Sequence, residues 1–144
     1  MTVMTQLAAK VLLLPIWMIA FGILVKGYFA AGDGFSAGVV AALGVLTQYV
    51  ALGTAAAERL WAVRYARQLS AAGLILALIV VFGPVLWGNP IMTHAPVAGH
   101  SVIQLGTLEL ITAFVFDIGV FLLVVGFCIG VIDLIAHSTF RRSR

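Results

Sequence analysis

Charged side chains are scarce in this chain of 144 residues. Asp, Glu, Lys and Arg together make up 9% of it, whereas a soluble domain carries about a quarter. Hydrophobic residues make up 63% and gather in runs long enough to cross a bilayer. The shortage of charge therefore argues against a soluble domain and predicts an all-α, polytopic membrane protein.

Cysteine is nearly absent as well. The single Cys128 lies inside an apolar run, so the chain has no disulfide framework and no cysteine-rich metal pattern. His94 and His100 are six residues apart, which fits neither ligation from one helical face nor a zinc motif. The net charge of +3 is not a nucleic-acid signal, because the basic residues cluster at the ends of apolar runs. We expect no metal, no cofactor and no nucleic-acid partner.

Four apolar runs predict four transmembrane helices in a single membrane domain, 1–144, with spans at roughly 7–25, 35–52, 69–87 and 105–132. A signal peptide is the competing interpretation of the first run, since Lys10 precedes an apolar core and Ala30 and Ala31 follow that core. The rest of the chain is equally apolar, so we expect the first run to remain as a span. The last apolar region, 103–132, exceeds the roughly 20 residues needed; its helix must tilt, project from the membrane or break.

The basic residues set the expected orientation. Four spans place the N-terminus, the middle connection and the C-terminus on one side. That side carries seven basic residues: Lys10, Arg59, Arg64, Arg67, Arg141, Arg142 and Arg144. The other side carries only Lys26, which predicts that both termini are cytoplasmic. Trp61 and Tyr65 suggest that the middle connection lies at the membrane interface.

Acidic residues interrupt the last span. An acid at the centre of a bilayer costs about 2.5–3.5 kcal/mol on insertion scales, so Asp117 should face protein or a wet cavity. A stripe on another side of the same helix holds small residues suited to close helix packing: Thr112, Gly119, Gly126 and Gly130. Asp117 points nearly opposite to this stripe and Glu109 lies between the two faces. We regard Asp117, Glu109 and Thr112 as candidates for an ion pathway.

Glycines gather between the first two spans, in 27–38, reading GYFAAGDGFSAG. The segment matches the G-x-G-x-x-G/A dinucleotide pattern, but that pattern requires a preceding strand and a βαβ unit. A tight turn through Gly27 and Gly32 is the physical interpretation, with a plain loop as the alternative. Gly34, Gly38 and Ala42 repeat every four residues, which predicts a close-packing face on the second span.

Two blocks resemble a known family. Phe116-Asp117-Ile118-Gly119-Val120 is similar to the last-span signature of the B subunit of multisubunit Na⁺/H⁺ antiporters, the Mrp or Mnh complexes. The 27–38 block resembles the signature Gly-His-x-x-Pro-Gly-Gly-Gly-Phe-x-Gly-Gly of the same family. This chain departs from that signature at four positions: Tyr28, Ala31, Asp33 and Ala37. The resemblance covers nearly the whole chain.

The resemblance implies a secondary-transporter subunit and not an enzyme. Its complex would exchange cytoplasmic cation for external proton in a prokaryotic cell membrane, with Na⁺ and H⁺ as the transported ions. Large complex I-like subunits and other small membrane subunits would be its partners, within the lipid bilayer. Two alternatives remain open: a membrane subunit of a complex I-related hydrogenase, and a purely structural adaptor whose Asp117 pairs with a basic residue of a neighbour.

Overall fold

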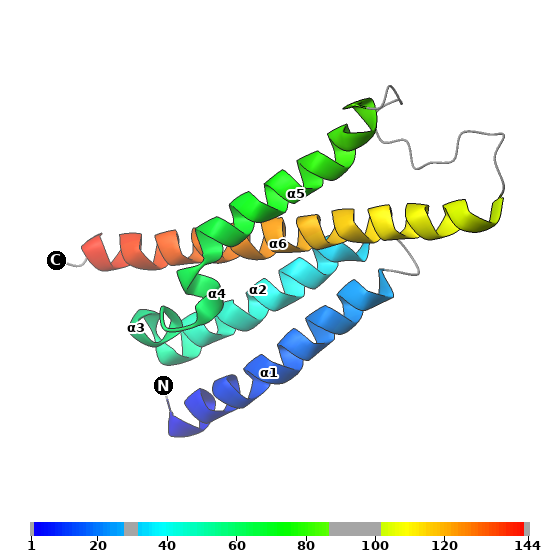
Figure 1. Cartoon of the computed structure of the whole chain (residues 1–144). Coiled ribbons are helices and arrows are strands. Elements are labelled where there is room, and N and C mark those ends of the chain that lie inside the picture. Colours follow the sequence, from blue (N-terminus) through cyan, green and yellow to red (C-terminus); the bar gives the residue numbers. More distant parts are fainter. Residues whose placement is uncertain (1, 28–31, 87–101, 143–144) are drawn as a thin grey trace.

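The structure is a computed structural model that describes residues 2–27, 32–86 and 102–142, without the side chains of 86, 102–111 and 139–142. Its elements are α1 (Val3–Lys26), α2 (Asp33–Leu52), α3 (Thr54–Ala57), α4 (Trp61–Arg64), α5 (Ala66–Leu86) and α6 (Val102–Arg142) (Figure 1). None of the described residues forms a strand. The prediction of an all-α chain is confirmed.

Four of these helices contain stretches apolar and long enough to cross a membrane: Val3–Lys26, Asp33–Leu52, Ala66–Val85 and Thr112–Ser138. At about 1.5 Å per residue, the 20 residues of α2 span the roughly 30 Å of a hydrocarbon core. The chain is thus a multi-pass membrane protein with four transmembrane helices, as its sequence predicts.

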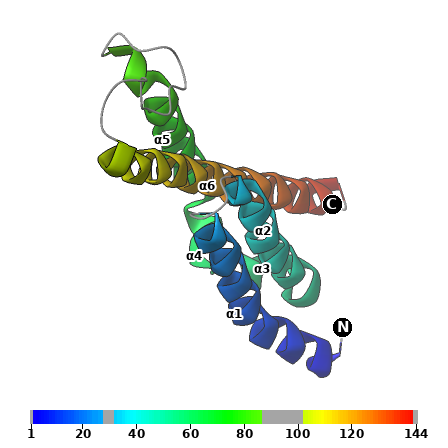
Figure 2. The ribbon, with the colours of Figure 1, turned by 90° about the vertical axis from the view of Figure 1, so that its right-hand side faces the viewer.

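The helices lie in the spatial order α1, α2, α6, α5, because α1 packs on α2, α2 on α6, and α6 on α5. Figure 1 shows the long α6 crossing the α1–α2 hairpin on one side and α5 on the other, and Figure 2 shows the same crossing after a quarter turn. The beginning of α1, the α3–α4 connection and the end of α6 lie toward the same end of the bundle (Figure 1).

Small side chains make the contact between α2 and α6 possible. Ala37 and Ala41 of α2 are fully buried in the same core cluster as the larger Phe121, Val125 and Ile129 of α6. Small residues let two helix backbones approach closely, which is the usual basis of helix packing in lipid. The small residues on the inner face of α2 therefore accommodate the larger residues of α6, Phe121, Val125 and Ile129, which are called the apolar ridge below.

The last helix is continuous over its 41 residues and projects beyond its neighbours. Asp117 lies beside the turn between α1 and α2, since it contacts Gly32 at the start of α2. Residues 102–116 consequently extend α6 by about 22 Å beyond Asp117, at 1.5 Å per residue. Figure 1 shows the beginning of α6 projecting from the bundle. The length of this region allowed a tilted, a projecting or a broken helix, and the unbroken α6 excludes the break.

The middle connection consists of two single helical turns, α3 and α4. They are separated by Leu60 in an extended conformation, and Gly53 before α3 has a φ of 83° that favours glycine. Trp61 is 60% exposed, and its ring centroid lies 5.9 Å from that of Tyr65. Exposed aromatic rings at one end of a transmembrane bundle suit the headgroup region.

Candidate functional site

Asp117 has its hydrogen-bond partner within this chain. The residue is 3% exposed, and its Oδ2 accepts a hydrogen bond from the backbone N–H of Gly32 at 3.0 Å. A buried carboxylate without a partner would be costly. The bond to Gly32 shows how the fold accommodates this acid at the contact between α6 and the start of α2.

The start of α2 suits a carboxylate for electrostatic reasons as well. Gly32 is the N-cap of α2 and has a φ of 116°, a left-handed conformation that glycine adopts without steric cost. The free N–H groups of a helix N-terminus carry partial positive charge and favour a nearby anion. Gly27 also approaches the acid, because a Cβ there would lie 3.0 Å from Asp117 Oδ2. The carboxylate therefore lies between the end of α1 and the beginning of α2.

Two further glycines hold α2 against α6 at this level. A Cβ on Gly34 would overlap the backbone carbonyl oxygen of Asp117, and one on Gly38 would lie 2.8 Å from Cβ of Val124. Any larger residue would push the two backbones apart and draw the N–H of Gly32 away from the carboxylate. The described glycines of the 27–38 block thus lie against Asp117 and the residues that follow it in α6.

The opposite face of α6 packs on α5. A Cβ on Gly119 would lie 3.0 Å from the backbone N of Ala77, and one on Gly126 would overlap the backbone N of Ser70. Gly130 differs from these two, because a Cβ there would meet no described atom within 4 Å. The small-residue stripe therefore serves the α5 contact at Gly119 and Gly126, whereas Gly130 lies on an exposed surface.

The other two ion-pathway candidates also belong to α6. Thr112 is half-buried and lies about 8 Å along the helix axis from Asp117, roughly 140° around the helix. The two side chains thus point in different directions. Glu109 lies within α6, about 12 Å along the axis from Asp117, but its side chain lies outside the described residues, as do His94 and His100.

Every fourth residue of α6 from Asp117 to Asp133 lies on one face of the helix, and the apolar ones among them belong to the buried core that α6 shares with α1 and α2. Phe121, Val125 and Ile129, between the two acids, are 4%, 1% and 0% exposed. The acids are about 24 Å apart along the axis, at 1.5 Å per residue. In the described part of the chain, the α2–α6 contact between these acids is apolar, so it offers an ion no polar route across the bundle.

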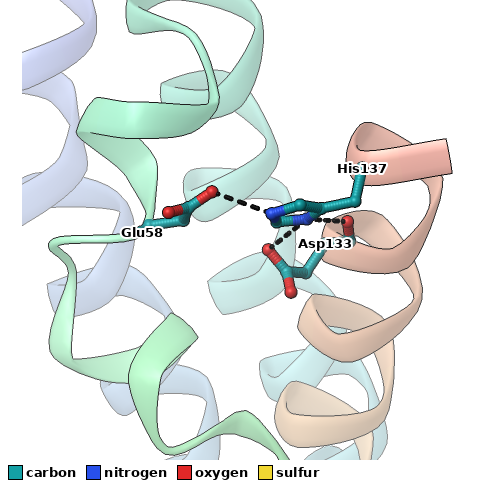
Figure 3. A group of neighbouring side chains, drawn as sticks. All are labelled: Glu58, Asp133 and His137. Atoms are coloured by element: carbon teal, nitrogen blue, oxygen red, sulfur yellow. Dashed lines mark hydrogen bonds and ion pairs between the residues drawn. The ribbon is translucent and has the colours of Figure 1, made fainter. Parts of the chain in front are cut away.

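A second polar group lies at the far end of that ridge. The Tyr49 hydroxyl of α2 donates a hydrogen bond to Oδ1 of Asp133 at 2.7 Å, and Asp133 lies beside His137 and Glu58 (Figure 3). Sequence reasoning missed this group. The sequence contains one indication of this group: Asp133 and His137 are four residues apart, which places them on the same face of a helix.

Comparison with known proteins identifies the family of the chain. Residues 4–130 match the family described as a domain related to the MnhB subunit of Na⁺/H⁺ antiporter. The B subunit of the Na(+)/H(+) antiporter of Bacillus subtilis is 31% identical over 92% of this chain and 92% of its own length. That of Alkalihalophilus pseudofirmus is 30% identical over 78% of this chain and 76% of its own length.

A longer relative matches as well. A protein of Rhizobium meliloti, named as a probable K(+)/H(+) antiporter subunit of the joint A/B type, is 33% identical over 88% of this chain, which spans only 12% of that protein. The family match extends over most of the chain and includes both the glycine block and Asp117. The chain therefore belongs to the family of domains related to the MnhB subunit of Na⁺/H⁺ antiporters.

Proposed function

We propose that this chain is a small membrane subunit of an antiporter complex that exchanges a monovalent cation for protons across a prokaryotic cell membrane. The observation that carries the proposal is the family match over residues 4–130. It is supported by the antiporter B subunit of Bacillus subtilis, which aligns over 92% of both chains. The relatives are named for Na⁺ or K⁺ exchange, so an alkali cation is the proposed cargo.

The partners proposed are the other subunits of such a complex, a large complex I-like one among them. The name of the Rhizobium relative joins the A and B types in one protein, which supports a large A-type neighbour in direct contact with this chain. The outer faces of the bundle are exposed and could contact such a neighbouring subunit. Leu14 of α1 is 68% exposed and Ile79 of α5 is 61% exposed, so these apolar faces suit lipid or the helices of other subunits.

Asp117 is proposed to act in the ion pathway at the boundary with a neighbouring subunit. Its carboxylate lies at one end of the bundle, beside the α1–α2 turn. The apolar ridge of Phe121, Val125 and Ile129 means that an ion does not continue from it along the α2–α6 contact. The projecting part of α6 carries Glu109 and Thr112, which we propose as further residues of the ion pathway, on other faces of the helix than Asp117.

A structural adaptor is the second candidate, and the bond between Asp117 and Gly32 favours it. In that case the carboxylate would serve only to fasten α6 to the start of α2. The two roles differ in what they require of the side chain. A clamp needs an oxygen that accepts the N–H of Gly32, whereas transport needs the negative charge and the titratable proton.

Both termini are proposed to be cytoplasmic, with the Asp117 site toward the outer face. The proposal rests on the distribution of basic residues, seven on one side and Lys26 on the other. It is supported by the fold, because the beginning of α1, the α3–α4 connection and the end of α6 all lie toward the same end of the bundle (Figure 1). External protons would then reach the Asp117 end first.

Deletion and complementation test the function. Everted membrane vesicles from cells lacking the gene should show no cation-dependent dissipation of a pH gradient, and the wild-type gene should restore it. A tagged chain should co-purify with large and small antiporter subunits. Unchanged antiport after deletion, or co-purification with a metal-cluster hydrogenase arm instead, would contradict the proposal and favour the hydrogenase alternative.

A further inference from the structure

Three potential metal ligands converge at the end of the bundle away from Asp117. Glu58 comes from the α3–α4 connection, while Asp133 and His137 come from one face of α6 (Figure 3). One ligand atom from each residue lies within 4.8 Å of the other two. The group is independent of the Asp117 site, from which Asp133 is separated by about 24 Å of helix.

The imidazole of His137 is oriented as in many metal sites. Its Nδ1 lies 2.9 Å from the backbone carbonyl oxygen of Asp133. With the proton on Nδ1, this nitrogen donates to the carbonyl, and the lone pair of Nε2 is directed toward Glu58, whose Oε1 is 3.1 Å away. Metal-bound histidines commonly donate their other ring N–H to a backbone carbonyl, which fixes the tautomer and the ring orientation.

The carboxylate of Asp133 is oriented by a residue from a third segment. Tyr49 of α2 donates its hydroxyl hydrogen bond to Asp133 Oδ1 at 2.7 Å, and the same oxygen lies 3.5 Å from Nδ1 of His137. Hydrogen bonds from a residue outside the ligand set are a usual feature of metal sites and tune the ligands they hold. Two helices and a connection thus bring three ligands and one supporting hydroxyl together.

We propose that Glu58, Asp133 and His137 bind a divalent transition-metal ion of the Zn²⁺ class. One imidazole nitrogen and two carboxylate oxygens form a ligand set that suits Zn²⁺, and three protein ligands leave a fourth position for water. The two carboxylates balance the charge of the ion. Without metal, a second ring proton on Nε2 bridges to Glu58 Oε1; the metal displaces that proton, binds the freed lone pair and fastens the α3–α4 connection to α6. Glu58 and His137 are 45% and 56% exposed, which gives an ion direct access.

The alternative is that a proton alone occupies this place. A protonated His137 would pair with both carboxylates through the same contacts, and such exposed ion pairs contribute little to stability. The two cases are distinguishable, because a metal site binds Zn²⁺ in competition with protons, whereas a simple ion pair does not bind it with useful affinity.

Zn²⁺ titration of the full chain in lipid nanodiscs, followed by calorimetry near neutral pH, tests the proposal. The wild type should bind one equivalent. His137→Gln should remove this binding, and Tyr49→Phe, which keeps all three ligands, should weaken it about 10–100-fold. His100→Gln is the matched control and should bind like the wild type. Far-UV circular dichroism verifies that each variant remains helical.

Co²⁺ gives a second measurement that does not depend on affinity. Its visible absorption bands should report a nitrogen and oxygen ligand set in the wild type and in His100→Gln, and should vanish in His137→Gln. The proposal is wrong if the wild type binds Zn²⁺ no more tightly than His137→Gln does. It is equally wrong if His100→Gln loses as much affinity as His137→Gln, since binding would then not be located at this site.

Discussion

Replacing Gly34 with alanine should separate α2 from α6 at the level of Asp117. The added Cβ would overlap the carbonyl oxygen of Asp117 and lie 3.0 Å from its Cα. These are backbone atoms in the middle of a continuous helix, so they cannot rotate away as the end of a flexible side chain would. The helices must therefore move apart, and the 3.0 Å hydrogen bond from Gly32 to Asp117 should lengthen.

Two effects of opposite sign set the magnitude. Overpacking a tightly packed contact costs about 1–3 kcal/mol, while exchanging glycine for alanine within a helix gains roughly 0.5–1 kcal/mol. Gly22 is the matched control, because it lies within α1 and a Cβ there would meet nothing within 4 Å. Gly22→Ala has only the favourable effect, so the difference between the two variants isolates the overpacking cost.

The assay is a thermal one on the purified complex that contains the chain. Samples of each variant are heated, and the fraction that still elutes as intact complex is measured by size-exclusion chromatography. Gly34→Ala should lose its assembly several degrees below Gly22→Ala, given about 2–4 °C per kcal/mol for a domain near this size. Equal midpoints for the two variants would refute the close approach of α2 to Asp117.

Two further predictions concern topology and assembly. In a Cys128→Ala background, a reagent that does not cross the membrane should label Thr93→Cys from outside but not Ser143→Cys; the reverse pattern would overturn the orientation. The chain reconstituted alone in liposomes should show no cation-dependent proton movement, because its α2–α6 contact is apolar between Asp117 and Asp133; robust antiport by the lone chain would contradict this.

The fold is largely predictable because its strongest signal is local. Apolar runs of bilayer length and basic residues at their ends define the four spans without any knowledge of packing. The close-packing roles of Gly34 and Gly38 also follow from spacing on one helix. The bounds of α6 are harder to predict from the sequence, because the helix continues through Asp133 and His137, beyond its apolar run.

The sites depend on which helices are neighbours, and a single sequence does not specify that. The sequence suggests a cavity or another subunit as the surroundings of Asp117, whereas the structure supplies the backbone N–H of Gly32, 85 positions away. Every residue except proline has a backbone N–H, so the sequence does not indicate which N–H will reach Asp117. Similarly, nothing local to Glu58 indicates that the α3–α4 connection would bring it to His137.

Antiport by the assembled complex carrying Asp117→Asn is the most direct test of the central claim, that this subunit contributes an ionisable group to the ion pathway. Asparagine keeps the shape and an oxygen that accepts the N–H of Gly32, but removes the charge and the titratable proton. The complex should assemble in wild-type amounts, with antiport lost or its pH profile shifted, whereas Asp117→Ala, which also loses the acceptor, should impair assembly. Normal assembly of Asp117→Asn with unchanged antiport and an unchanged pH profile would contradict the claim and leave Asp117 as a clamp between α6 and α2.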